Sequence, residues 1–218
     1  MNILLIDTAS RKIEFAYNKK SDFCILKTLD VSKNADDLVY EIKSEFDEKG
    51  FCFQDIDFIG LSNGPGSFTG LRIGSAISKA MCFATGANLI EVNSLDLIAE
   101  KYYLSNGGKA KVIPLITSGM KSGEFYYAVF ENGKRITDYQ TAIPKDFGKI
   151  EGLLLLNDNI VHDFPADRST VNMFDKTNLT ALYSLAVKCI KAGRISDYMT
   201  SEPFYMKQFL GNKTSEVK

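Results

Sequence analysis

The glycine-rich segment at residues 64–74, with the sequence GPGSFTGLRIG, has residue types and spacing that could hold an anion. It connects a predicted strand to a predicted helix, and the free N–H groups and the dipole of a helix N-terminus both favour negative charge. The segment lacks the G-x-G-x-x-G spacing of dinucleotide-binding loops and the lysine of a phosphate-binding P-loop. The candidate nucleotide contacts in this segment are Gly66, Ser67, Thr69, Gly70 and Arg72.

The same glycines also have a purely structural interpretation. Pro65 fixes its own φ angle, and Gly64 and Gly66 can adopt backbone conformations that other residues avoid. The segment therefore also fits a sharp turn that binds nothing. The sequence leaves these two interpretations open.

Few other residues could carry catalysis or a metal ion. Asp7 follows the first apolar run and is a further candidate for contact with a nucleotide. The single histidine, His162, cannot supply the ligands of a histidine-rich zinc site, and we expect it on the surface. The four cysteines form no C-x-x-C pair, and we expect them to be buried free thiols in a reducing cytosol. No metal site is predicted.

Charge and hydropathy restrict the class of protein. The chain has 218 residues with a net charge of -1, so no global positive field draws it onto RNA. Its hydrophobic fraction of 45% is typical of a globular protein with a substantial core. The first residues do not resemble a signal peptide, and no apolar run reaches the roughly 18 residues of a membrane span. We therefore expect a cytoplasmic protein without a membrane contact.

Hydrophobic periodicity predicts a series of short strands and helices. In the first half, predicted strands cover residues 3–6, 13–17, 23–29, 56–61 and 89–92, and predicted helices cover residues 34–49, 69–85 and 95–104. Ser94 is predicted to cap the third helix, and Gly86 to end the second. This order matches one ribonuclease-H-like half of an actin-like fold, although the pattern alone supports only a mixed α/β class.

The sequence Ser-Asn-Gly-Gly at residues 105–108 is the predicted boundary between domains at residues 1–107 and 108–218. The second half has predicted strands at residues 111–117, 124–130, 136–142 and 153–156, and a helix at residues 182–190. Asn132-Gly133 favours a type I′ hairpin, because both central positions require a positive φ. We expect this smaller half to be related to the first, with its final helix and tail packing back on residues 1–107.

The predicted helix at residues 69–85 is apolar around most of its circumference. From residue 70 to residue 84 only Arg72 and Lys79 are charged, and Gly70, Gly74 and Ser78 form a stripe of small residues. A helix of this kind must be buried on more than one side, which predicts a partner chain, with cover by the second half of the same chain as the alternative. The predicted interface residues, on this helix and the one before it, are Leu38, Ile42, Gly70, Ile73, Gly74, Ile77, Ser78 and Met81.

Three sequence segments resemble the TsaB (YeaZ) family. They are the glycine-rich segment followed by Val-Asn-Ser-Leu at residues 92–95, the IDTA sequence at residues 6–9, and the PFYMK sequence at residues 203–207. The resemblance spans the chain and is strongest over residues 1–100. It implies an actin-like (ASKHA) α/β fold of two ribonuclease-H-like halves, each with a mixed sheet.

The resemblance also implies a function. Family members pair with the catalytic paralogue TsaD and with the ATPase TsaE, and the complex transfers threonylcarbamoyl to the adenosine beside the anticodon of tRNA. This subunit would then be a non-catalytic scaffold, a homodimer when alone, with tRNA contacted only through the complex. No cofactor is expected for the subunit itself, although ATP or ADP could lie at the partner interface.

The sequence departs from the family at two places and leaves three alternatives. Residues 117–126, with the sequence TSGMKSGEFY, stand where many members have an Asp-Ala-Arg motif before a Glu-Val-Tyr strand, and here the Asp and Arg are absent. Lys33 or Asn34 stands where a histidine is common. An actin-like small-molecule kinase is the main alternative, but it needs the D-x-G-T turn that here reads Asp-Thr-Ala-Ser, and Ala9 carries a Cβ that disfavours this turn. A peptidase would need a nucleophile and a base or metal ligands. An adaptor outside tRNA modification is the third alternative.

Overall fold

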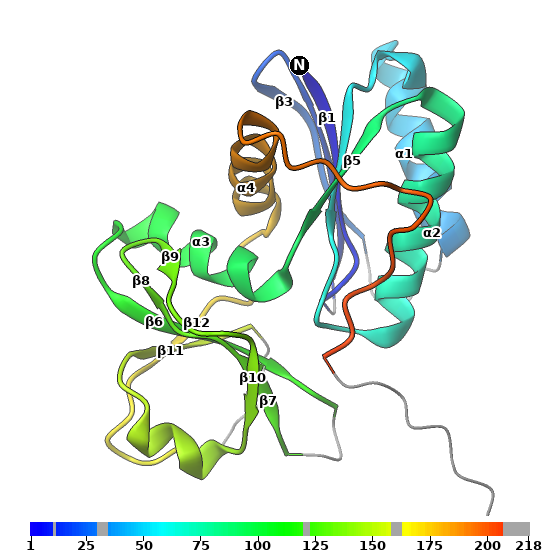
Figure 1. Ribbon diagram of the computed structural model, residues 1–218. Coiled ribbons are helices and arrows are strands. Elements are labelled where there is room, and N and C mark those ends of the chain that lie inside the picture. Colours follow the sequence, from blue (N-terminus) through cyan, green and yellow to red (C-terminus); the bar gives the residue numbers. More distant parts are fainter. Residues whose placement is uncertain (11, 30–34, 120–122, 158–162, 207–218) are drawn as a thin grey trace, which may run out of the picture.

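Two lobes, each built on a β-sheet, make up the computed structural model of the chain, with helices between the sheets (Figure 1). The structure describes residues 1–10, 12–29, 35–119, 123–157 and 163–206. None of the helices among these residues has the length and apolar character needed to cross a membrane.

The first sheet has the strand order β3-β2-β1-β4-β5. The strands are β1 (Asn2–Asp7), β2 (Ile13–Lys19), β3 (Asp22–Leu29), β4 (Phe58–Ser62) and β5 (Asn88–Val92). The first three form an antiparallel meander, and β1, β4 and β5 run parallel. Strand β1 is central because its apolar run is buried on both faces, as expected for a strand covered by helices on two sides.

Alternate residues of β1 belong to different cores, because successive side chains of a strand point to opposite faces. Leu4 and Ile6 pack with α1 (Ala35–Lys49) and α2 (Phe68–Thr85), near the short helix η1 (Phe53–Asp55). Ile3 and Leu5 pack with α4 (Leu179–Lys191) on the other face.

The second sheet has the order β10-β7-β6-β11-β12, and β8 pairs with β6 and β9. Its strands are β6 (Lys111–Thr117), β7 (Phe125–Tyr127), β8 (Phe130–Glu131), β9 (Lys134–Arg135), β10 (Gln140–Ala142), β11 (Leu153–Leu156) and β12 (Thr170–Asn172). The short helix η2 (Pro144–Lys149) buries Phe147 against one face. Strands β6, β11 and β12 are parallel, whereas β7 and β8 pair antiparallel with β6, so this sheet is also mixed.

Helix α3 (Ser94–Asn106) lies between the two sheets. Leu97 packs with α4 and the first sheet, whereas Ile98 and Tyr103 pack with β6 and β11 of the second. Helix α4 follows the second sheet in sequence but packs on the first, and beyond it Ser196 forms an isolated bridge with Leu89. The two lobes are therefore joined by packed helices as well as by the chain.

Most predicted elements are present, and four details were wrong. Asn93, and not Ser94, caps α3, because its Oδ1 accepts from the N–H of Leu95 at 2.9 Å. The predicted strands at residues 124–130 and 136–142 are shorter, since Val129 N–H bonds to the Thr137 hydroxyl and leaves the ladder. Strand β12 was not predicted. Cys52 is exposed, and only Cys82 and Cys189 are buried.

The turn at Asn132 and Gly133 has φ angles of 52° and 73°, as the hairpin prediction requires.

The predicted docking groove on α2 faces the interior of this chain. An added Cβ would lie 1.9 Å from the Thr8 carbonyl oxygen at Gly70 and 2.3 Å from Thr8 Oγ1 at Gly74. Ser78, Leu38 and Ile42 are fully buried, and Ile77 is 8% exposed. The small residues therefore allow α2 to approach its own sheet, and these positions cannot form a free surface. A bulky charge at Gly74 or Ser78 would test folding and not docking.

Gly70→Ala should destabilise the protein by about 1–3 kcal/mol, because its Cβ has no room beside the Thr8 backbone. Helix propensity alone would make the alanine variant more stable than the glycine protein by about 1 kcal/mol. The expected loss of stability is therefore opposite to the effect of propensity. Urea unfolding measures the change. The matched control is Gly108→Ala, whose Cβ would meet nothing within 4 Å. Equal or greater stability of Gly70→Ala would contradict the packing argument.

Candidate functional site between the lobes

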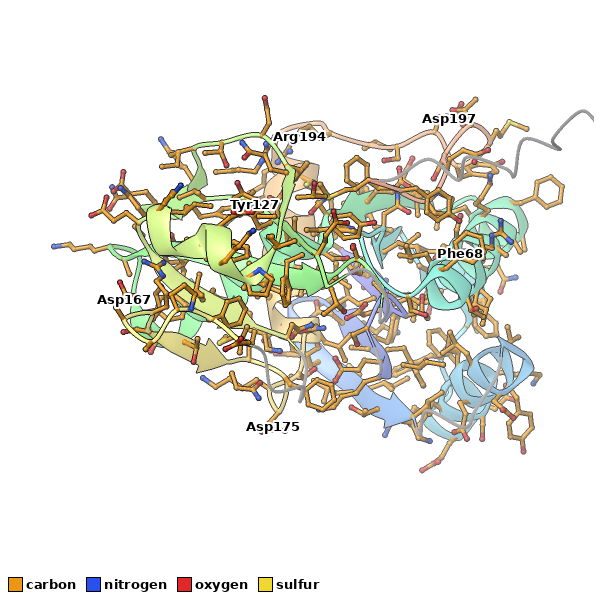
Figure 2. The ribbon with its side chains drawn as sticks, turned by 90° about the horizontal axis from the view of Figure 1, so that it is seen from below. Phe68, Tyr127, Asp167, Asp175, Arg194 and Asp197 are labelled. Carbon is orange, nitrogen blue, oxygen red and sulfur yellow. The ribbon has the colours of Figure 1, made fainter. Side chains whose placement is uncertain are left out.

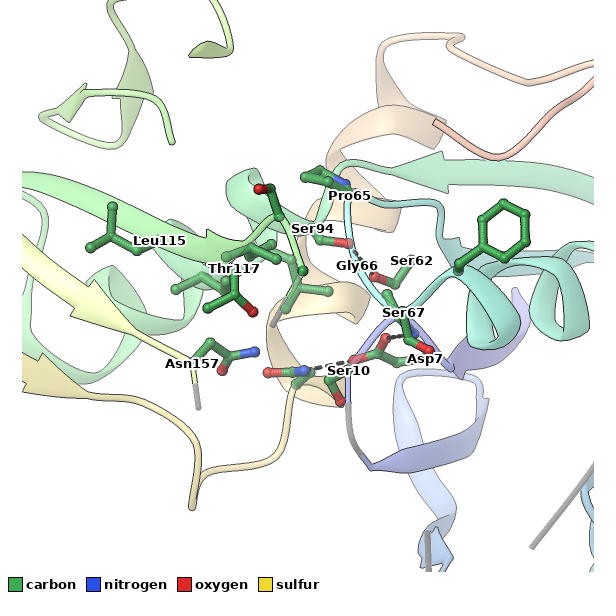
Figure 3. Close-up of a pocket in the computed structure, with 18 residues that line it drawn as sticks. Asp7, Ser10, Ser62, Pro65, Gly66, Ser67, Ser94, Leu115, Thr117 and Asn157 are labelled. Atoms are coloured by element: carbon green, nitrogen blue, oxygen red, sulfur yellow. Dashed lines mark hydrogen bonds between the residues drawn. The ribbon is translucent and has the colours of Figure 1, made fainter. Parts of the chain in front are cut away.

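A cavity of ≈ 500 Å³ lies where the two lobes meet, at the carboxyl ends of β1, β4 and β6 (Figure 3). Figure 3 shows Asp7, Ser10, Ser62 and Ser67 on one side and Leu115, Thr117 and Asn157 on the other. The lining residues are Asp7, Ala9, Ser10, Ser62, Pro65, Gly66, Ser67, Phe68, Ser94, Leu97, Ile98, Leu115, Ile116, Thr117, Ser118, Gly119, Asn157 and Asn178. The volume is within the range of small-molecule sites.

The wall formed by residues 64–68 is held against the loop after β1. The N–H of Ser67 donates to the Ala9 carbonyl at 2.8 Å, and the Thr8 hydroxyl donates to the Gly70 carbonyl at 2.7 Å. At Gly66 an added Cβ would lie 2.2 Å from the Ala9 carbonyl oxygen. The glycines here are therefore explained by the close approach of two backbone segments.

Asp7 is the charged residue of the cavity lining and is 1% exposed. Its Oδ2 accepts from Asn178 Nδ2 at 2.6 Å, and its Oδ1 accepts from the N–H of Ala9 at 3.0 Å. Burial raises the pKa of Asp7 to about 6, and the nearby Glu14 carboxylate adds to this rise, whereas the hydrogen bond from Asn178 opposes it. The carboxyl group is thus costly to ionise and is held in place by donors from the protein.

Asn178 joins Asp7 to two further buried charged side chains. Its backbone N–H donates to Glu14 Oε2 at 3.0 Å, and its Oδ1 accepts from Lys101 Nζ at 2.8 Å. Burial lowers the pKa of Lys101 to about 8, although Glu14 and Asp7 act in the opposite direction. These four residues come from β1, β2, α3 and the start of α4, so the network ties α3 and α4 to the first sheet.

The structure separates the predicted nucleotide contacts into two groups. Asp7, Gly66 and Ser67 line the cavity, whereas Thr69, Gly70 and Arg72 do not. The Arg72 guanidinium lies 3.8 Å from the centre of the Phe68 ring, and its Nε donates to the Tyr205 hydroxyl at 3.4 Å. A single phosphate site built from all six residues is therefore not present in this arrangement.

Several lining residues were not predicted from the sequence. Thr117, Ser118 and Asn157 reach the cavity from the second lobe, and Asn178 reaches it from the start of α4. They stand more than 100 residues after Asp7 in the sequence, and none of them forms a recognisable motif. Only the packing of the second sheet against α3 brings them opposite the loop after β1.

The chemical capacity of the cavity is limited. The lining residues that the structure describes include hydroxyls and carboxamides but no lysine, arginine, histidine or cysteine. The Ser62 hydroxyl bonds to the Ser94 hydroxyl at 3.1 Å and also interacts with the Asp7 carboxyl group, whereas Ser10 bonds to the backbone of Lys12. In the described ranges, no three His, Cys, Asp or Glu side chains lie close enough to hold a metal ion.

A family model described as TsaD, tRNA N6-adenosine threonylcarbamoyltransferase, matches residues 32–197, which is more than half of the chain. The chain belongs to this family. A tRNA N6-adenosine threonylcarbamoyltransferase of Ehrlichia chaffeensis is 39% identical over 69 residues, which cover 30% of this chain and 20% of that protein.

Two further curated relatives match over 136 residues at 29% identity. One is an uncharacterized protein of Mycobacterium tuberculosis, for which the match covers 61% of each chain. The other is the tRNA threonylcarbamoyladenosine biosynthesis protein TsaB of Escherichia coli, for which it covers 61% of this chain and 58% of that protein. The matched region therefore spans about three-fifths of these relatives.

The solved structure of YeaZ from Pseudomonas aeruginosa shares the fold, with a TM-score of 0.77 and 19% identity over 94% of this chain and 100% of that chain. The predicted resemblance to TsaB (YeaZ) is confirmed. The predicted fold class is confirmed as an α/β chain of two mixed-sheet halves with the fold of YeaZ.

The places where the chain departs from the TsaB pattern lie partly at the cavity. Thr117, Ser118 and Gly119, which begin the segment where the family's Asp-Ala-Arg motif is absent, line it. Lys33, Asn34 and His162 lie outside the described residues, so the predictions about them remain predictions.

Asp7→Asn tests the buried carboxyl group through the pH dependence of stability. Because the pKa of Asp7 is raised from 3.8 to about 6 on folding, the folded protein holds a proton that the unfolded chain releases. Relative to Asp7→Asn, the free energy of unfolding of the unaltered protein should fall by about 2 kcal/mol between pH 4 and pH 6, and it should level off above about pH 7.

Urea unfolding at intervals from pH 4 to pH 8 measures this difference. Asp167→Asn, at an exposed position in the second lobe, is the control for removal of a carboxylate. A difference between the unaltered protein and Asp7→Asn that does not vary with pH would contradict the assignment.

Proposed function

We propose that this protein is a non-catalytic accessory subunit in the biosynthesis of threonylcarbamoyladenosine in tRNA. The observation that carries the proposal is its membership of the TsaD family combined with a cavity whose described lining holds one carboxyl group and no lysine, arginine, histidine or cysteine. In this proposal it activates a TsaD-type transferase, works in a complex that also contains a TsaE-type ATPase, and meets tRNA only through that complex. The similarity to the E. coli biosynthesis protein TsaB supports this role.

The loop after β1 supports the accessory role over the kinase alternative. The N–H of Ala9 donates to Asp7, and the Ala9 carbonyl accepts from Ser67, so this loop bonds to its own chain. A phosphate in the cavity would meet the Asp7 carboxylate without a described cation to offset the repulsion. No observation favours small-molecule phosphorylation in particular.

The outward side of α2 is the proposed docking face for the TsaD-type partner. Ala76, Ala80 and Phe83 are exposed on this side, and Phe83 is 77% exposed. Ile73 and Met81, from the predicted interface, are partly buried at its edges. The neighbouring helix α1 adds exposed Val39 and Tyr40. Because Ala76 and Ala80 are small and one helical turn apart, another helix can approach closely here.

This docking face replaces the groove predicted from the sequence. The glycine side of α2 packs inward on Thr8, and the exposed alanine side lies on the opposite surface of the same helix. A helix face of this kind suits an isologous contact between two copies when the partner is absent, as well as a contact with a paralogue. We therefore propose that homodimer and heterodimer use the same residues.

Ala80→Arg should weaken association with the TsaD-type partner at least about tenfold, because it places a long charged side chain in the centre of the docking face. The fold should be unaffected, since Ala80 is exposed. Titration calorimetry measures the affinity, circular dichroism checks the fold, and a reconstituted transfer assay should lose activity in parallel.

Ile136→Arg is the matched control, because Ile136 is an exposed apolar residue of the second lobe. Unchanged affinity of Ala80→Arg would place the interface elsewhere.

We propose that the contacts for ATP or ADP are Arg72 and the backbone at residues 66–70, at the edge of the partner interface. The isolated protein should hydrolyse neither ATP nor peptides above background, because the described lining offers the Asp7 carboxyl group but no cation to bind phosphate and no histidine, lysine or cysteine. ADP should bind measurably only when the partner is present, and Arg72→Ala should weaken that binding about tenfold. Lys145→Ala, at an exposed lysine of the second lobe, is the control.

Two results would contradict this proposal. Tight ADP binding by the isolated protein would argue for a complete nucleotide site within one chain. ATP turnover that Asp7→Ala abolishes would favour the kinase alternative.

A further inference from the structure

The segment at residues 194–206 crosses the first lobe after α4 and ends between the two lobes (Figure 1). We call it the strap. Figure 2 shows the positions of its residues Arg194 and Asp197, and of Phe68 at the start of α2. The proposed function does not account for this segment, although its PFYMK sequence is among those that resemble the family.

The strap is fixed to β5 and α2 by hydrogen bonds. The N–H of Ser196 donates to the Leu89 carbonyl at 2.9 Å, and the Ser201 hydroxyl donates to Glu91 Oε1 at 2.5 Å. Lys79 of α2 donates to the Ser201 carbonyl at 2.9 Å. Because these bonds use the strap backbone or partly buried side chains, the first part of the strap has a defined path.

The strap also supports the wall of the cavity from behind. The N–H of Phe204 donates to the Asn63 carbonyl at 2.9 Å, and Asn63 Nδ2 donates to the Glu202 carbonyl at 3.0 Å. Gly64 lies so close that an added Cβ would be 2.7 Å from the Phe204 carbonyl oxygen. The next residues of the wall, from Pro65 to Phe68, line the cavity.

At its end the strap contacts the second lobe. The Phe204 ring lies 5.5 Å from the Tyr139 ring in an edge-to-face arrangement, and Tyr139 precedes β10. The Tyr139 hydroxyl donates to Asp96 of α3 at 3.0 Å, and the Arg135 guanidinium lies 4.1 Å from the centre of the Tyr139 ring. Tyr139 is therefore held in place before Phe204 packs on it.

The neighbouring residue, Tyr205, contacts α2. Its ring lies 5.5 Å from the Phe68 ring, and its hydroxyl accepts from Arg72 Nε. Phe68 also lines the cavity, and Arg72 is exposed beside the docking face. Two consecutive strap residues thus contact the second lobe, the cavity wall and the docking helix.

We propose that the strap couples partner docking on α2 to the closure of the two lobes around the cavity. A partner bound over Ala76, one helical turn from Arg72, restricts Arg72 and with it Phe68, and these two residues hold Tyr205 and so keep Phe204 on Tyr139. Since coupling between two sites is reciprocal, loosening the contact between Phe204 and Tyr139 weakens partner binding. The partner half of this inference rests on the proposed docking face, whereas the lobe-closing half rests on the strap contacts alone.

The claim that the strap holds the two lobes together is tested on the free protein, by measuring the distance between two spin labels. Ser44→Cys on α1 and Lys145→Cys on η2 place one label on each lobe, in a background with Cys24→Ser and Cys52→Ser. Phe204→Ala should broaden the distance distribution. Tyr139→Leu removes the same ring pair from the other lobe and should have the same effect. Glu202→Ala, an exposed strap side chain, should not. A distribution unchanged in Phe204→Ala and Tyr139→Leu overturns the inference.

The coupling half is tested by hydrogen exchange with and without the TsaD-type partner. Partner binding should slow exchange at residues 139–142 of the second lobe, although the docking face does not include them. Phe204→Ala should abolish this slowing and weaken binding by about fivefold to tenfold.

The coupling is overturned if partner binding still slows exchange at residues 139–142 in Phe204→Ala. It is also overturned if partner binding does not slow exchange there in the unaltered complex. If the unaltered protein does not bind the partner at all, the docking proposal fails and the coupling fails with it. The spin-label result still decides whether the strap holds the lobes.

Discussion

The close approach of α2 to the loop after β1 is the constraint on which the rest of this structure depends. Gly66, Gly70 and Gly74 meet the backbone or hydroxyl of Thr8 and Ala9 at distances that no Cβ would allow. The hydrogen bonds from Ser67 to Ala9 and from Thr8 to Gly70 form only at this separation. One wall of the cavity and the orientation of α2 follow directly from it.

This approach also determines which face of α2 meets solvent. With the glycines turned toward the sheet, the opposite side of the helix presents alanines and Phe83. An apolar outer face on a helix is costly in water unless another surface covers it, and small side chains allow a covering helix to come close. The packing of α2 on its own sheet and the proposed docking on its outer side thus both depend on the orientation of α2 about its axis.

The network around Asn178 consists of buried charged and polar groups, in contrast to the apolar packing of α2. Burying Asp7, Glu14 and Lys101 removes three ionisable groups from water, which is unfavourable unless each has partners. Asn178 supplies those partners through both its side chain and its backbone. The network therefore fixes the start of α4 relative to β1, β2 and α3. This explains how a carboxyl group can remain buried at the end of β1.

The sequence by itself determined the order of most elements and whether each is a helix or a strand. The apolar run at residues 3–6, the helical spacing at residues 69–85 and the Asn-Gly turn each reflect local preferences, which do not depend on distant residues. The local motifs around Asp7 and Gly66 also identified one side of the cavity.

Only the tertiary structure decided which way α2 faces, because a helix that is apolar all round gives no periodic signal for its buried side. It also brought Thr117, Asn157 and Asn178 opposite Asp7, and Phe204 onto Tyr139. These contacts join residues that are far apart in the chain, and they exist because α3 packs between the two sheets.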